Sequence, residues 1–181
     1  VEGSSNLTYD GTDLILAGGN INVDTGKGID FSATADVETM QSELFDDYEA
    51  GTYVPTFNCV TSGSYTATAG EATLAYTKIG QHVFIHGAIS ISAESSPLGS
   101  VLVGLPTTPL NNTQYSDHCY QHIAIANHGD AGMENPVMYL NTARAECDLN
   151  NITDAGSGES INSTRLDTAF SLSIAFHYIS S

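Results

Sequence analysis

The sequence has very little positive charge. Its 4 Lys and Arg residues stand against 21 Asp and Glu residues, which gives a formal net charge of −17. Four cations cannot form a basic patch, and an acidic chain repels a phosphate backbone, so the composition argues against nucleic acid as a partner. We expect a solvated acidic surface, with divalent cations as the ions that it would attract.

Cysteine is scarce, and long apolar runs are missing. Cys59, Cys119 and Cys147 are odd in number and form no CxxC pair, which favours buried, reduced thiols over a disulfide framework. No apolar run approaches the about 20 residues that span a bilayer, and no signal peptide is visible, so we expect no membrane insertion. The sequence begins at Val1 instead of Met, from which we expect a fragment of a longer protein.

Strand-forming and turn-forming residues dominate what is present. Hydrophobic residues make up 41% of the 181 residues and charged residues only 14%, and the 6 Phe and 9 Tyr allow a packed core. Many Thr, Ser, Gly and Asn residues take the place of charged ones, which favours strands and turns over helices. The length fits one all-β domain with a short additional module.

Residues 1–35 contain short apolar units between turn signals such as Asp10-Gly11 and Gly18-Gly19. The units are Leu7–Tyr9, Leu14–Leu16, Ile21–Val23 and Ile29–Phe31. Each unit is too short to bury a core by itself. We therefore predict that this segment intertwines with identical chains as a short trimeric β stem.

Residues 36–45 have the pattern of a short helix. Asp36 can cap the N-terminus, and Val37, Met40 and Leu44 recur at helical spacing. We expect a junction helix between the stem and a head domain.

Residues 46–181 have the pattern of a β-rich head. Strands are expected at Ala72–Ile79, Val83–Ile91, Val101–Leu105, Cys119–Ala126 and Val137–Leu140, with a turn at Gly80-Gln81. Alternation is clearest in the last strand, at Phe170, Leu172, Ile174, Phe176 and Tyr178. Short strands separated by turns predict an antiparallel β-sandwich of jelly-roll type.

Two motifs are distinctive. Residues 45–56 contain an acidic-Tyr-Glu-x-Gly-Thr-aromatic-x-Pro segment, and residues 75–83 contain Tyr-x-Lys-Ile-Gly-x-x-Val. The motif residues are Asp46, Asp47, Tyr48, Glu49, Gly51, Thr52, Pro55, Tyr76, Lys78 and Gly80. With the stem phrases and the closing strand, they resemble the C-terminal head region of bacteriophage tail fibre and receptor-binding proteins. Ala50 and Tyr53 depart from that pattern, which usually has Glu and Trp there.

The resemblance implies a homotrimer at the tip of a tail fibre. Such a protein is made in the bacterial cytoplasm, joins the rest of the fibre in the virion, and binds a receptor on the host surface. We expect a glycan or a protein as the receptor, and favour a glycan. The alternatives are a structural knob that trimerises the fibre and, less favoured because no long repeat is present, part of a glycan-degrading tailspike.

The acidic residues of the first motif are interpreted as structural. Asp46, Asp47 and Glu49 can accept bonds from backbone N–H groups, Gly51 permits unusual backbone angles, and Pro55 restricts its strand to an edge or a bulge. Paired carboxylates can also cleave glycosidic bonds, but adjacent acids on an extended segment point to opposite sides. No Gly-x-Ser-x-Gly or Cys–His signature occurs either, so we predict no catalytic residue, no cofactor and no enzyme.

Histidines occur on two expected strands. His82 and His86 share one face but lie about 13 Å apart, so one ion cannot join them within a chain. In a trimer either one could meet its symmetry mates around a metal ion, although we favour packing around Phe84 at a subunit interface and predict no metal site.

The segment from residue 107 to residue 133 is the best candidate for receptor contact. Aromatic faces stack on sugars, and Asn and Asp side chains bond to hydroxyl groups. The candidate residues are Asn111, Asn112, Tyr115, Asp117, His118, Tyr120, Asn127, His128 and Asp130. His118, Tyr120 and His122 share one strand face, and residues 154–162 form a second candidate loop.

Overall fold

The computed structural model describes residues 7–16, 21–24, 27–30, 44–45, 48–110, 120–130, 132–140, 144–153 and 158–181. The chain divides into two units, Val1–Asp46 and Asp47–Ser181. Every regular element among the described residues is a β-strand, and no helix that could cross a membrane occurs there. The predicted all-β, antiparallel class is confirmed.

The first unit contains two small strand pairs. β1 (Leu7–Tyr9) pairs with β2 (Leu14–Leu16) around the predicted Asp10-Gly11 turn. The Asp10 carboxylate accepts bonds of 2.8 Å from the N–H groups of Thr12 and Asp13. The bond from Asp13, followed by that from Thr12, lowers the pKa of Asp10. β3 (Ile29–Asp30) pairs with β4 (Leu44–Phe45).

The junction helix predicted for residues 36–45 is wrong at its end. Leu44 and Phe45 form β4, opposite Asp30 and Ile29, and residues 36–43 lie outside the described residues. A helix of ten residues is marginal by itself, whereas strand pairing gives the backbone of Leu44–Phe45 partners from another segment. Ile21–Val23 forms no strand, and Ile21 is 68% exposed. The intertwined trimer stays a prediction.

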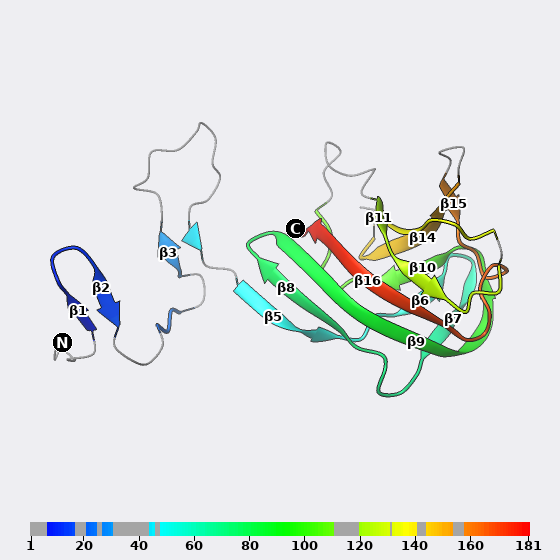
Figure 1. Cartoon of the computed structure of the whole chain (residues 1–181), viewed down its shortest axis with the longest axis horizontal. Helices are drawn as coiled ribbons and strands as arrows, with labels where there is room; N and C mark the ends of the chain where they lie inside the picture. The colour runs from blue at the N-terminus through cyan, green and yellow to red at the C-terminus, as the bar shows by residue number, and fades with distance from the viewer. Residues whose placement is uncertain are drawn as a thin grey trace. The chain divides into compact units, whose positions relative to one another are not determined.

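The second unit is one antiparallel sheet of twelve strands, curled into a half-barrel (Figure 1). Its order is β11-β13-β14-β10-β6-β7-β9-β16-β12; β15 also pairs with β14, β8 with β9, and β5 with β8. The strands are β5 (Tyr48–Tyr53), β6 (Phe57–Cys59), β7 (Ser62–Ala67), β8 (Leu74–Ile79), β9 (His82–Leu98), β10 (Val101–Gly104), β11 (Tyr120–His122), β12 (Ala124–Ala126), β13 (Pro136–Leu140), β14 (Glu146–Ile152), β15 (Gly158–Ser160) and β16 (Phe170–Ile179).

The predicted division into two sheets of a jelly-roll sandwich is wrong, because β9 continues around the corner. Its 17 residues pair with β8 and β16 along the first half and with β7 along the second. Gly87 lies within β9 at a φ of 144°, and irregularities in the pairing with β7 bend the strand further. Hydrogen bonding therefore passes from one half to the other without a break.

Residues 120–126 join the two ends of the sheet. The strand expected at Cys119–Ala126 is divided at Ile123, whose N–H donates to the Pro136 carbonyl at 3.0 Å. β11 pairs with β13, whereas β12 pairs with β16. One short segment thus covers two strands that would otherwise be edges.

The core lies on the inner face of the curled sheet. All five alternating apolar side chains predicted for β16 are buried, from Phe170 at 2% exposure to Tyr178 at 3%. Tyr65 packs edge-on against Phe170, with ring centroids 5.3 Å apart. Cys59 and Cys147 are buried free thiols, as expected, and Cys119 lies outside the described residues.

Candidate receptor-binding surface

The two tail-fibre-like motifs meet on neighbouring strands. Glu49 of β5 lies opposite Lys78 of β8, and Gly51 lies opposite Tyr76. The Tyr76 hydroxyl donates to the Glu49 carboxylate, and this bond raises the pKa of Tyr76. A Cβ atom on Gly51 would lie 3.2 Å from the Tyr76 ring. Of the other motif residues, Tyr48 and Thr52 are exposed on β5, and Pro55 is buried after the end of that strand. Gly80 lies in the turn after β8 with a φ of 56°. Asp46 and Asp47 lie outside the described residues.

The structure separates the predicted receptor residues that it describes. Tyr120 lies on β11, whereas Asn127, His128 and Asp130 lie in the connection between β12 and β13. The candidates outside the described residues are Asn111, Asn112, Tyr115, Asp117 and His118.

Asp130 is engaged within the chain. Its carboxylate accepts a bond of 2.5 Å from Arg165 Nε and one of 2.8 Å from the Gly132 N–H. The Arg165 bond is the main cause that lowers the pKa of Asp130. The Asp130 N–H in turn donates to His128 Nδ1 at 3.3 Å, and Arg165 also reaches Glu159 at 3.3 Å. This network holds the loop, so Asp130 contributes to shape more directly than to ligand contact.

Tyr120 forms half of an aromatic pair on the outer face of the sheet. It lies opposite Tyr139 of β13, and the two rings stack with centroids 4.9 Å apart and planes 26° from parallel. Tyr120 is 41% exposed. Sequence reasoning missed Tyr139, although it lies between the inward-facing Met138 and Leu140 of a predicted strand and so must face outward.

A continuous row of outward-facing residues leads away from this pair. Each residue lies opposite the next across neighbouring strands β11, β13, β14, β10, β6 and β7. We call this the outer row; it consists of Tyr120, Tyr139, Asp148, Leu102, Asn58 and Ser64. Because neighbouring strands lie about 4.8 Å apart, it extends about 24 Å along the sheet.

Polar groups accompany the outer row. Arg144 Nη2 donates to both oxygens of the Asp148 carboxylate, at 3.0 and 3.2 Å. Asn58 Nδ2 donates to Glu146 Oε1 at 3.2 Å. Asn150, the next outward position after Asp148 on β14, is only 8% exposed, yet its Oδ1 accepts no hydrogen bond within the described part of the chain.

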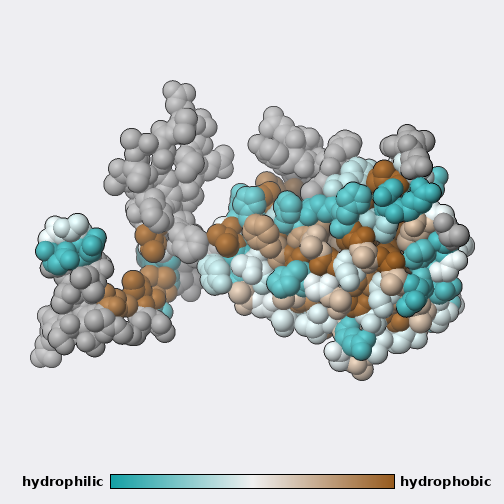
Figure 2. All heavy atoms as spheres, viewed as in Figure 1, coloured by the Kyte–Doolittle hydropathy of each residue, from teal (hydrophilic) through white to brown (hydrophobic). Residues whose placement is uncertain are grey.

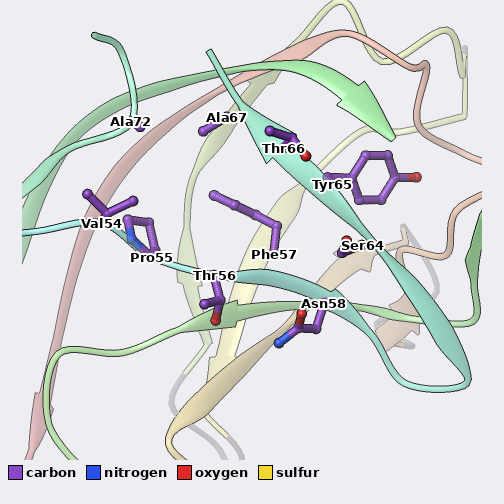
Figure 3. Close-up of a pocket in the computed structure, with 10 residues that line it drawn as sticks. All are labelled: Val54, Pro55, Thr56, Phe57, Asn58, Ser64, Tyr65, Thr66, Ala67 and Ala72. Atoms are coloured by element: carbon purple, nitrogen blue, oxygen red, sulfur yellow. The ribbon is translucent and has the colours of Figure 1, made fainter. Parts of the chain in front are cut away.

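The far end of the outer row opens into a groove of about 340 Å³ (Figure 3). Asn58 and Ser64 belong to both. The groove is lined by Val54, Pro55, Thr56, Phe57, Asn58, Ser64, Tyr65, Thr66, Ala67 and Ala72. None of these side chains is charged, so the groove offers hydroxyl, amide and apolar contacts but no carboxylate pair for acid–base cleavage. Burial raises the pKa of Tyr65 to about 12.

Metal ligands do not gather in the described residues. No three His, Cys, Asp or Glu side chains there lie close enough together to hold an ion. His82 and His86 are exposed on the outer face of β9, where His82 stacks beside Phe84 with ring centroids 6.2 Å apart.

Comparison with known proteins relates the fold to phage tails. No protein-family model matches the chain, and no curated protein sequence matches it. Among solved structures, the chain is similar to the crystal structure of Dettilon tailspike protein (gp208), with a TM-score of 0.52 and 17% sequence identity. The match covers 73% of this chain and 23% of the tailspike chain. The chain thus shares a fold with one part of a tailspike and spans about a quarter of its length.

Proposed function

We propose that this chain is a receptor-binding part of a phage tail fibre or tailspike, that it acts as a homotrimer in the virion, and that it binds a host-surface glycan without cleaving it. The stacked Tyr120–Tyr139 pair on the outer row carries the proposal. The fold similarity to a tailspike and the tail-fibre-like motifs support the phage context.

The chemistry of the outer row favours a neutral sugar chain. The exposed ring of Tyr120 provides flat apolar surface for the C–H faces of sugars, and the exposed amide of Asn58 suits their hydroxyl groups. Asp148 and Glu146 already have partners in Arg144 and Asn58. A net charge of −17 repels polyanionic glycans, so an uncharged polysaccharide is the expected class.

The proposed attachment depends on repeated weak contacts. Leu102 in the middle of the outer row is only 5% exposed, so the aromatic pair and the groove at the two ends are separate, small contact areas, and a single site is expected to bind weakly. Three linked sites raise the apparent affinity by about 10²–10⁴ when a polymeric glycan can engage them together.

The test is binding of the purified chain to neutral surface polysaccharide from permissive host cells. Tyr120→Ala is expected to weaken binding about tenfold, or about 1.4 kcal/mol, whereas Tyr120→Phe keeps the ring and most of the affinity. Leu98→Ala, another exposed apolar position at 55% exposure, is the control and should bind like the unmodified chain. Equal binding by Tyr120→Ala and the control would refute the site.

The two alternative functions predict different results when the purified chain is mixed with the same polysaccharide. A glycan-degrading tailspike part would release reducing ends from the polysaccharide. A structural knob would show no saturable binding at all while still assembling.

A further inference from the structure

The outer face of the other half of the sheet has an unusual composition. Its outward positions lie opposite one another across β5, β8, β9, β16 and β12. We call this surface the acid-free face; it consists of Tyr48, Ala50, Thr52, Ala75, Thr77, Ile79, His82, Phe84, His86, Ala88, Ser90, Ser171, Ser173, Ala175, His177, Ile179, Ala124 and Ala126. It contains no Asp, Glu, Lys or Arg, although the whole chain has 21 acidic residues.

Large apolar side chains are exposed on this face. Tyr48 is 62% exposed, Ile79 is 42% exposed and Phe84 is 45% exposed. The Phe84 ring lies between His82 and His177, with ring centroids 6.2 and 6.0 Å away. Figure 2 shows brown, apolar residues exposed among pale and teal ones over β8, β9 and β16. Exposed large apolar side chains on an uncharged face are typical of a protein–protein contact.

We propose that copies of this chain pack against one another through the acid-free face. Each copy carries a charge of −17, so copies repel wherever their acidic surfaces approach. Contact through a face without acids keeps the carboxylates at its rim or beyond, where salt with a Debye length of about 8 Å screens them. A strongly basic or acidic partner would find no complementary charge there.

The size and shape of the face fit such a contact. Nine residues of β9 at about 3.3 Å each and the four spacings of about 4.8 Å between the five strands give a footprint of roughly 600 Å². This is of the same order as the about 800 Å² that each partner buries in a specific interface. The small Ala, Ser and Thr side chains around Phe84 let neighbouring copies around a three-fold axis approach the face closely.

This contact supplies a location for the homotrimer of the proposed function, but it does not depend on receptor binding. The measurement is the molar mass of the full chain by light scattering at several concentrations and salt levels. The unmodified chain is expected to be multimeric. Phe84→Glu and Ser173→Glu, which place a charge on the face, should weaken assembly by at least tenfold. Leu98→Glu adds the same charge elsewhere and should assemble like the unmodified chain.

Histidine labelling gives a second readout that holds even if other segments also link the copies. Diethylpyrocarbonate should modify His82 and His86 slowly in the assembled chain, whereas His122, exposed on the other half of the sheet, should react freely. A monomeric mass for the unmodified chain, Phe84→Glu and Ser173→Glu chains that assemble normally, or equal labelling of all three histidines would overturn the proposal. Loss of glycan binding alone would leave it intact.

Discussion

The buried hydroxyl of Tyr178 is expected to stabilise the fold, whereas that of Tyr65 does not. The Tyr178 hydroxyl donates to the Thr107 carbonyl at 2.9 Å, and the Thr107 N–H donates to it at 3.2 Å. Their side-chain hydroxyls also lie 2.7 Å apart. Tyr178→Phe would leave the Thr107 groups without these partners, which costs about 1–3 kcal/mol per buried group left unsatisfied. We expect a loss of about 2 kcal/mol.

The same substitution at two other tyrosines is the matched comparison. The hydroxyls of Tyr53 and Tyr65 are buried without a hydrogen-bond partner in the described part of the chain. Tyr53→Phe and Tyr65→Phe remove these unsatisfied groups, so the free energy of unfolding should stay constant or rise by about 1 kcal/mol.

Urea denaturation of the three variants measures the difference. The midpoint should fall for Tyr178→Phe and stay constant or rise for the other two, with the denaturant dependence unchanged in all three. A Tyr178→Phe protein that is as stable as Tyr65→Phe would refute the reasoning that these contacts, and not ring burial alone, hold the C-terminal strand.

Two further predictions concern the pH dependence of stability and the room for a Cβ atom at two glycines. Burial raises the pKa of Tyr65 from 10.0 to about 12 in the folded chain. The unfolded chain therefore loses this proton first, and the free energy of unfolding should fall as the pH rises from about 10 toward about 12, which urea denaturation across that range would show. At Gly63, with a φ of 77°, a Cβ would lie 2.3 Å from the carbonyl oxygens of Ser95 and Ser96, whereas at Gly70, with a φ of 85°, no atom lies within 4 Å. Gly63→Ala should therefore cost about 2–4 kcal/mol and Gly70→Ala about 1 kcal/mol, and equal thermal stability of the two would contradict this.

Strands with one buried and one exposed face are the ones that alternation predicts most clearly. The period-two pattern of β16 arises because its alternate side chains fill the core, so sequence alone locates it. The sequence did not predict β14, because the Asn150-Asn151 pair is typical of a turn. In the structure the Asn151 side chain is fully buried, accepting bonds from the N–H groups of Glu134 and Asn135 at 3.0 Å. Such long-range partners satisfy a polar side chain that would otherwise not belong in a strand.

Other features depend on register and bending, which sequence does not display. A pattern of alternating residues does not show whether a strand ends or continues past a bend, and β9 continues past Gly87. Tyr120 was recognised as a candidate from its aromatic ring, but its stacking partner Tyr139 is fixed by pairing of β11 with β13. Asp130 was a candidate because its carboxylate can bond to hydroxyl groups, but Arg165, far along the sequence, engages this carboxylate instead.

Titration of the isotopically labelled chain with neutral host polysaccharide, followed by NMR, tests the central claim most directly. Saturable shifts concentrated at Tyr120, Tyr139 and Asn58 are the predicted result. Saturable shifts confined to the acid-free face, or no shifts with any neutral polysaccharide tested, would contradict the account.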